Sequence, residues 1–189
     1  MYILIVLILA FTTLTLGVWT VYREYRIRKL RRLISELKKW HELALTDDLT
    51  GIPNRASYSL DTVSILHGSN CAVLLFDIDD FKNINDTFGH LVGDNVLRQC
   101  AALLCDVFAA YNGKVYRIGG DEFAVLIEDA NDDLVKSAVF DVRNAERTNQ
   151  NFKLSRGYAF LADFADITQC FDSADRMLYT DKISKKVSY

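Results

Sequence analysis

The sequence is poor in metal-binding side chains of the nitrogen and sulfur type. It has three histidines with no metal-ligand spacing, and its four cysteines show no CxxC pair. Neither His67 nor His90 is therefore read as a metal ligand, and His90 is interpreted as a turn or capping residue rather than a catalyst. Each cysteine lies in an apolar run where a small buried hydrophobic residue would fit, which predicts free thiols in a reducing compartment. The cysteines are Cys71, Cys100, Cys105 and Cys170.

The sequence also lacks a strong net charge, which is −3 over 189 residues. No basic face extends over the whole protein, so we expect no nucleic-acid partner. Half of the residues are hydrophobic, which excludes a disordered or fibrous chain and leaves room for one packed domain with a short appendage.

Charged side chains are absent from Tyr2 to Tyr22. About 20 apolar residues suffice for an α-helix to cross the hydrocarbon layer of a membrane. A cleaved signal peptide would place basic residues before this run and small residues after it, whereas here the basic residues follow. Because cationic flanks stay on the cytoplasmic side, we expect residues 1–22 to be a single-pass anchor in the inner membrane, with everything downstream in the cytoplasm.

The next segment, residues 23–46, is predicted to be a connecting helix. Ile27, Leu30, Ile34 and Leu37 recur at helical spacing with charged residues between them. This pattern fits a short coiled coil between two chains and equally an amphipathic helix that leans on its own domain. Both interpretations stay open at this point.

Residues 47–189 are predicted to form one α+β domain, which begins near Thr46 at a turn-rich cluster that holds the only proline. Asp94 is expected to cap a helix after a turn at 89–93. The expected helices are 56–66, 81–85, a helix that starts at Asp94, 134–147 and 167–183, and the expected strands are 71–76, 114–118, 123–127 and 153–160.

Gly119 and Gly120 separate two short β-type runs, which is typical of a hairpin whose turn requires positive φ angles. The tip would then carry the carboxylates of Asp121 and Glu122. If the strand that ends at Asp77 lies beside this hairpin, three carboxylates meet and repel one another unless a cation neutralises them. Oxygen ligands without histidine or cysteine suit Mg²⁺ or Mn²⁺. The alternative, a solvated acidic turn, does not account for a second acidic cluster and a lysine nearby.

Three motifs occur in a known order and approximate spacing. They are Asp47-x-Leu-Thr-Gly-x-Pro-Asn-Arg55, Asp77-x-Asp-x-Phe-Lys82-x-x-Asn85-Asp86-x-x-Gly-His90-x-x-Gly93-Asp94, and Arg117-x-Gly-Gly-Asp-Glu-Phe123. On these residues the chain resembles the GGDEF family of diguanylate cyclases, and the resemblance covers nearly everything after Thr46. It implies a nucleotidyl cyclase or palm-like fold with a central, mainly antiparallel sheet flanked by helices.

The resemblance also implies a reaction and assigns residues to it. Two GTP molecules would condense to cyclic di-GMP with release of pyrophosphate, and each domain of a homodimer would supply one GTP. Asp77, the Ile78 carbonyl and Asp121 would hold the metal, and Asp121 or Glu122 would help to deprotonate the ribose hydroxyl. The implied substrate-binding residues are Asn85 and Asp94 at the guanine, Lys82 and Lys182 at the phosphates, Phe81, Gly119 and Gly120, and Lys186 as a poorer phosphate partner.

The chain departs from the family pattern at a feedback site that many members carry as Arg-x-x-Asp. Here the matching residues are Ala110-Tyr111-Asn112-Gly113, so product inhibition through that site is not expected. Two rival functions remain at the level of sequence. One is a GTP-binding signalling domain without turnover, and the other is a cyclase with a different nucleotide product.

Overall fold

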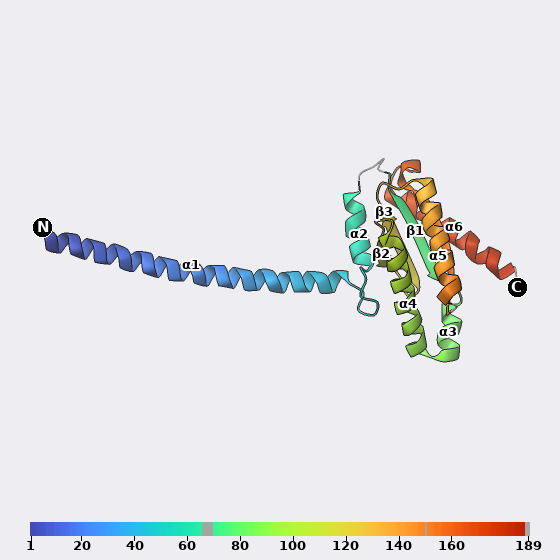
Figure 1. The fold of residues 1–189 in the computed structure, drawn as a ribbon, viewed down its shortest axis with the longest axis horizontal. Coiled ribbons are helices and arrows are strands. Elements are labelled where there is room, and N and C mark those ends of the chain that lie inside the picture. Colours follow the sequence, from blue (N-terminus) through green and yellow to red (C-terminus); the bar gives the residue numbers. More distant parts are fainter. Residues whose placement is uncertain (66–69, 150, 188–189) are drawn as a thin grey trace. The chain divides into compact units, whose positions relative to one another are not determined.

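The computed structural model describes residues 1–65, 70–149 and 151–187 and divides the chain into two compact units, Met1–Ala44 and Leu45–Tyr189 (Figure 1). The first unit consists of helix α1 (Tyr2–Leu45), in which no residue is buried. The expected anchor and connecting segment thus form one continuous helix of 44 residues.

The apolar half of α1 is long and hydrophobic enough to cross a membrane, with a mean hydropathy of 2.3 over its most apolar 18 residues. Its threonines keep their polar atoms satisfied within the helix. Thr12, Thr13, Thr15 and Thr20 each donate a hydroxyl hydrogen bond of 2.8–2.9 Å to a carbonyl three residues earlier. Such local bonds lower the cost of placing hydroxyl groups in hydrocarbon.

The second unit is built on an antiparallel sheet with strand order β2-β3-β1-β4. The central strand β1 is buried along its whole length, which explains why its sequence is continuously apolar up to Asp77. The strands are β1 (Ala72–Ile78), β2 (Lys114–Arg117), β3 (Glu122–Ile127) and β4 (Leu154–Phe160).

Helices cover both faces of the sheet, and alternate residues of β1 enter two separate cores. Phe76 packs in a core with Leu104 and Val142, whereas Leu75 packs in the other with Leu178. Gly157 lets the last helix rest directly on β4, because a Cβ atom there would lie 2.1 Å from the carbonyl oxygen of Ala174. The helices are α2 (Arg55–Ser64), α3 (Phe81–Phe88), α4 (His90–Ala109), α5 (Asp132–Asn149) and α6 (Ile167–Val187), with a 3-10 turn at Leu161–Asp163.

The palm-like α+β arrangement expected for residues after Thr46 is confirmed, but one boundary was wrong. The expected turn at 89–93 does not exist, since α4 begins at His90 and Asp94 lies inside its helix instead of capping it. Gly89, with φ of +85°, makes the break between α3 and α4 in a single residue. Leu66, the expected end of the helix after Arg55, and His67 lie outside the described residues.

Candidate active site

The end of β1 and the hairpin tip are joined by the sheet itself. Asp77 lies directly opposite Glu122 on β3 and opposite Ser155 on β4. The amide of Ile78 donates a hydrogen bond of 3.2 Å to the carbonyl of Asp121. The expectation that the strand ending at Asp77 lies beside the hairpin is therefore confirmed, which brings the backbones of Asp77, Asp121 and Glu122 to one end of the sheet.

A cavity of about 580 Å³ opens at this end of the sheet. Seven of the sequence-predicted site residues line it: Asp77, Ile78, Phe81, Lys82, Asp121, Lys182 and Lys186. The lining combines carboxylates with lysines, which is the composition expected where a polyphosphate and a cation bind together.

Asp77 is the buried charge of this cavity, with 4% of its surface exposed. Burial raises the pKa of its carboxyl group to about 6, and the neighbouring Asp121 and Glu122 add to the increase. The Nζ atom of Lys182 on α6 lies 2.6 Å from Asp77 Oδ2 and opposes the increase without cancelling it. The folded protein therefore disfavours the Asp77 carboxylate even though Lys182 pairs with it.

The hairpin tip differs from the expected glycine turn. Neither Gly119 nor Gly120 has a positive φ, because four residues rather than two connect the strands and relax the turn. Gly119 instead lies close to the Glu122 side chain. A Cβ atom on it would lie 2.3 Å from Glu122 Oε2, so glycine leaves room for that carboxylate. Around Gly120 there is open space, which leaves its backbone accessible.

Arg117 holds the tip in place, a role that the sequence did not reveal. Its Nη2 and Nε atoms donate to the Gly120 carbonyl at 2.6 and 3.2 Å, and its Nη1 contacts both oxygens of Asp47 at 3.0 and 3.1 Å. Burial would raise the pKa of Asp47, but hydrogen bonds from Thr50 and Arg117 outweigh it and lower that pKa. The turn that follows α1 is thereby connected to the signature loop.

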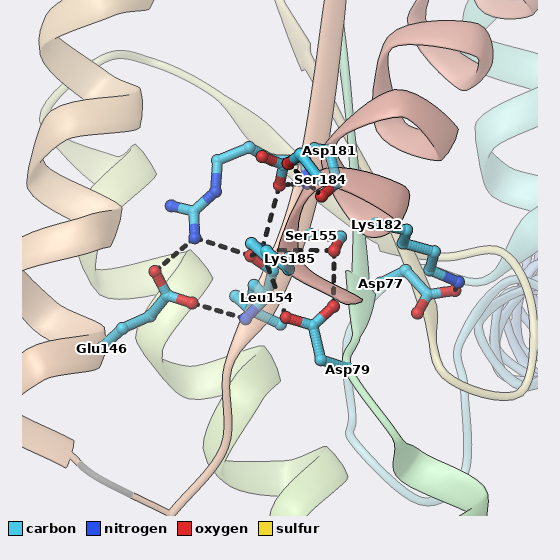
Figure 2. Close-up of polar contacts among 10 residues, drawn as sticks. Asp77, Asp79, Glu146, Leu154, Ser155, Asp181, Lys182, Ser184 and Lys185 are labelled. Atoms are coloured by element: carbon cyan, nitrogen blue, oxygen red, sulfur yellow. Dashed lines mark hydrogen bonds and ion pairs between the residues drawn. The ribbon is translucent and has the colours of Figure 1, made fainter. Parts of the chain in front are cut away.

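A second network that the sequence did not reveal lies on the other side of Asp77 (Figure 2). Lys185 on α6 contacts Asp79 Oδ2 at 3.2 Å, the Leu154 carbonyl at 2.6 Å and Asp181 at 3.0 Å. The Ser155 hydroxyl donates a bond of 2.5 Å to Asp79 Oδ1. The helical spacing of Lys182, Lys185 and Lys186 was the available signal that all three face the same cavity.

Five of the predicted residues do not line the cavity, and two of them, Gly119 and Gly120, lie at the hairpin tip. Asn85 and Asp94 do not line it, although α3 and α4 meet closely where Gly93 faces the Asn85 side chain. A Cβ atom at Gly93 would lie 1.9 Å from Asn85 Oδ1. Glu122 lines a different cavity, of about 360 Å³, between α2 and α6.

The donor set of the large cavity suits a hard cation. Within residues 1–65, 70–149 and 151–187, no three carboxylate, histidine or cysteine side chains are grouped so as to hold a metal by themselves. Two carboxylates, Asp77 and Asp121, with a peptide carbonyl leave coordination positions for substrate oxygens and water, as Mg²⁺ prefers. A buried carboxylate at Asp77 that Lys182 only partly stabilises is consistent with such a ligand.

Comparison with known proteins agrees with this geometry. The probable diguanylate cyclase DgcI of Escherichia coli K12 is 35% identical over 149 residues, covering 79% of this chain and 34% of that protein. The diguanylate cyclase DgcN of the same organism is 33% identical over 176 residues, covering 79% of this chain and 42% of that protein. The chain thus spans well under half the length of either relative.

Solved structures give the same assignment. The coiled coil and GGDEF domain of DgcB from Caulobacter crescentus, in complex with c-di-GMP, superposes with a TM-score of 0.74 at 25% identity, covering 82% of this chain and 90% of that one. Diguanylate cyclase SiaD from Pseudomonas aeruginosa, in complex with its activator SiaC, gives a TM-score of 0.67 at 25% identity, covering 92% and 74%. The sequence model of the family described as diguanylate cyclase, GGDEF domain, matches residues 44–187. The chain therefore belongs to the GGDEF domain family of diguanylate cyclases.

Proposed function

We propose that this chain is a diguanylate cyclase that condenses two GTP molecules into cyclic di-GMP. In each of two steps, the 3′-hydroxyl of one GTP attacks the α-phosphorus of the other and pyrophosphate leaves. The observation that carries the proposal is the cavity in which Asp77, Asp121, Lys82 and Lys182 meet beside an intact signature loop. The names of the relatives support it, although they belong to longer proteins.

The metal would be held by Asp77, Asp121 and the Ile78 carbonyl. When bound, Mg²⁺ or Mn²⁺ supplies positive charge for the triphosphate and for the leaving pyrophosphate. Lys182 now pairs with Asp77 at 2.6 Å, and we expect it to turn towards a phosphate oxygen once a divalent cation neutralises that carboxylate. Lys82 in the first turn of α3 and Lys186 would bind further phosphate oxygens.

Of the two carboxylates at the tip, Asp121 is better placed to accept the proton of the ribose hydroxyl. Asp121 lines the cavity, whereas Glu122 lines the neighbouring cavity between α2 and α6. For the guanine we propose the contact region of α3 and α4, where Asn85 and Asp94 offer an amide and a carboxylate to the base edge, next to Phe81.

The division of labour along the chain is also part of the proposal. Residues 1–22 would anchor it in the inner membrane, residues 23–46 would pair with a second chain, and residues 47–189 would act in the cytoplasm. A product made from two GTP molecules held by two domains requires a homodimer. Membrane anchoring and helix pairing raise the effective concentration of one GTP-binding domain near the other.

Pyrophosphate release tests the proposal. The chain is incubated with Mg²⁺ and either GTP or ATP, beside Asp121→Asn. We expect release from GTP only, and only from the parent chain. Binding of GTP without release of pyrophosphate by the parent would identify the non-catalytic alternative, and equal release from ATP would refute the assignment of guanine recognition.

Replacing Arg117 by glutamine is expected to lower kcat by about tenfold to a hundredfold, because the signature loop loses the contact that fixes the Gly120 carbonyl. Arg98→Gln is the matched control, since Arg98 donates to the Leu49 carbonyl in the same turn as Asp47 but does not contact the loop. Equal losses in both variants, measured as initial rates at saturating GTP, would show that Arg117 only stabilises the turn.

Product inhibition through the family's feedback site should be absent, because Ala110-Tyr111-Asn112-Gly113 offers no charged group to a phosphate. Initial rates are measured with added cyclic di-GMP, up to about ten times the GTP concentration that gives half-maximal rate. We expect only competitive inhibition, in which cyclic di-GMP and GTP compete for the active site. Non-competitive inhibition by cyclic di-GMP would contradict this expectation.

A further inference from the structure

Arg156 is a buried cation with unused hydrogen-bond donors. It lies on β4 with 6% of its surface exposed. Its Nη2 atom donates to Glu146 on α5 and to the Leu154 carbonyl at 2.7 Å, while Nε and Nη1 are buried and have no partner in the described part of the chain. Buried donors without a partner cost free energy, so their presence points to a missing acceptor.

The missing acceptor has a place to bind. A cavity of about 260 Å³ lies against Arg156 at the outer edge of β4, between α5 and α6. Five basic and two acidic side chains line it, together with Leu154. They are Arg143, Arg147, Lys153, Arg156 and Lys185, and Glu146 and Asp181.

Both acidic side chains of this cavity already have partners. Glu146 pairs with Arg156 itself, and Asp181 accepts the Arg156 amide at 3.0 Å and the Lys185 ammonium group at 3.0 Å. Figure 2 shows Glu146 on one side of Leu154 and Asp181 with Lys185 on the other. Arg143 and Arg147 form no ion pair within the described residues. The lining therefore keeps an excess of positive charge.

We propose that this cavity, centred on Arg156, binds a phosphate-bearing anion. Arg156 lines the cavity with a planar guanidinium group whose two unused donors match phosphate oxygens once the side chain turns them to the cavity, and Arg143 and Arg147 add further charge. The site is distinct from the catalytic cavity, although Lys153 and Lys185 line both. It does not depend on the proposed cyclase activity.

The anion has two sources that the surroundings allow. Inorganic phosphate or pyrophosphate fits the 260 Å³ cavity alone. The phosphate of a nucleotide fits as well, because an adjoining cavity of about 500 Å³ shares Arg143 and Arg156 and is lined by Phe140 and Tyr158, on which a base can stack. Phosphate recognition by Arg156 is common to both sources.

Isothermal titration of the full chain in detergent tests the site. Lys82→Ala, Lys182→Ala and Lys186→Ala are introduced first to weaken phosphate binding in the catalytic cavity. Pyrophosphate should still bind to this triple variant, with a Kd of about 1 mM or tighter. Two results would overturn the proposal. If no pyrophosphate binds up to about 10 mM, water accounts for the unused Arg156 donors; if the parent binds and the triple variant does not, the catalytic cavity accounts for the binding.

Further substitutions in the same background locate the bound anion. Arg143→Gln with Arg147→Gln should weaken pyrophosphate binding by about tenfold or more, since two charge-assisted contacts are lost. Arg156→Lys keeps the buried charge but removes the planar donors and should weaken binding similarly. Arg176→Gln, an exposed arginine on α6 outside both cavities, is the matched control and should change the Kd by less than about twofold. Unchanged binding in the Arg143 and Arg147 variant would overturn the proposal.

Comparison of three probes identifies the source. Tighter binding of AMP than of inorganic phosphate would support a nucleotide whose base lies over Phe140 and Tyr158. Equal binding of AMP and phosphate, with pyrophosphate tightest, would support an inorganic anion held by the basic cavity alone.

Discussion

Asp77→Asn is expected to abolish turnover and to stabilise the globular unit at pH 8. Asp77 is buried, and its pKa is raised from 3.8 to about 6, so above pH 6 the folded state holds a carboxylate that it disfavours. Between about pH 4 and pH 6 the folded state binds more protons than the unfolded state, and the free energy of unfolding therefore falls as pH rises. Asparagine removes this loss, which we expect to be about 1–3 kcal/mol at pH 8.

Denaturant titrations at pH 5 and pH 8 measure this effect. The gain from Asp77→Asn should appear at pH 8 and shrink at pH 5, where the parent carboxyl group is largely protonated. Asp79→Asn is the matched control, because Asp79 accepts bonds from Ser155 and Lys185 and its replacement should destabilise the unit at both pH values. An Asp77→Asn chain less stable than the parent at pH 8 would contradict the account.

Turnover of this variant should fall by a factor of about a thousand or more, as expected when a charged group that stabilises the transition state is removed. Mg²⁺ together with a non-hydrolysable GTP analogue should raise the melting temperature of the parent but not of Asp77→Asn. These opposite effects on stability and activity would identify Asp77 as a residue kept for function at the cost of stability.

The second large effect concerns the connecting helix. Leu30 and Leu37 are 51% and 59% exposed on α1, and their spacing suits the seam of a coiled coil. Glutamate at both positions should separate the chains, because like charges would face one another in the seam. With residues 23–189 at nanomolar concentration, we expect turnover per chain to fall by about tenfold or more and to recover as protein concentration rises.

Ser35→Glu with Lys39→Glu is the matched control for that experiment. Whether Ile27 or Leu30 occupies the first core position of the heptad, Ser35 and Lys39 lie outside the seam. The control therefore adds carboxylates without placing them between the two chains. Analytical ultracentrifugation gives the dimer fraction alongside the rate. An unchanged dimer fraction and rate in the Leu30 and Leu37 variant would favour the other interpretation, a helix that acts without pairing.

The parts of the fold that could be predicted from sequence depend on local patterns. The buried strand β1 was evident from its continuous apolar run, and the hairpin from two β-type runs around Gly119 and Gly120. The start of α4 was misplaced because a five-residue turn was expected between α3 and α4, whereas Gly89 alone separates the two helices. The glycine pair was explained wrongly because neither residue has a positive φ; Gly119 lies against the Glu122 side chain and Gly120 faces open space.

The contacts that position the site were not predictable in the same way. Arg117 and Asp47 are 70 residues apart, and Lys185 and Asp79 are 106 apart. Such pairs are set by how the turn after α1 and the last helix pack on the sheet, which no local periodicity encodes. The unpartnered nitrogens of Arg156 are likewise evident only in three dimensions.

The mass of the product made from GTP and Mg²⁺ tests the central claim most directly. The account predicts that the chain yields cyclic di-GMP and that Asp121→Asn yields none. An equal mixture of labelled and unlabelled GTP should give product molecules that carry zero, one or two labels. Unchanged GTP after prolonged incubation, with GTP binding and dimerisation intact, would contradict the cyclase assignment and leave a domain that binds GTP without turnover.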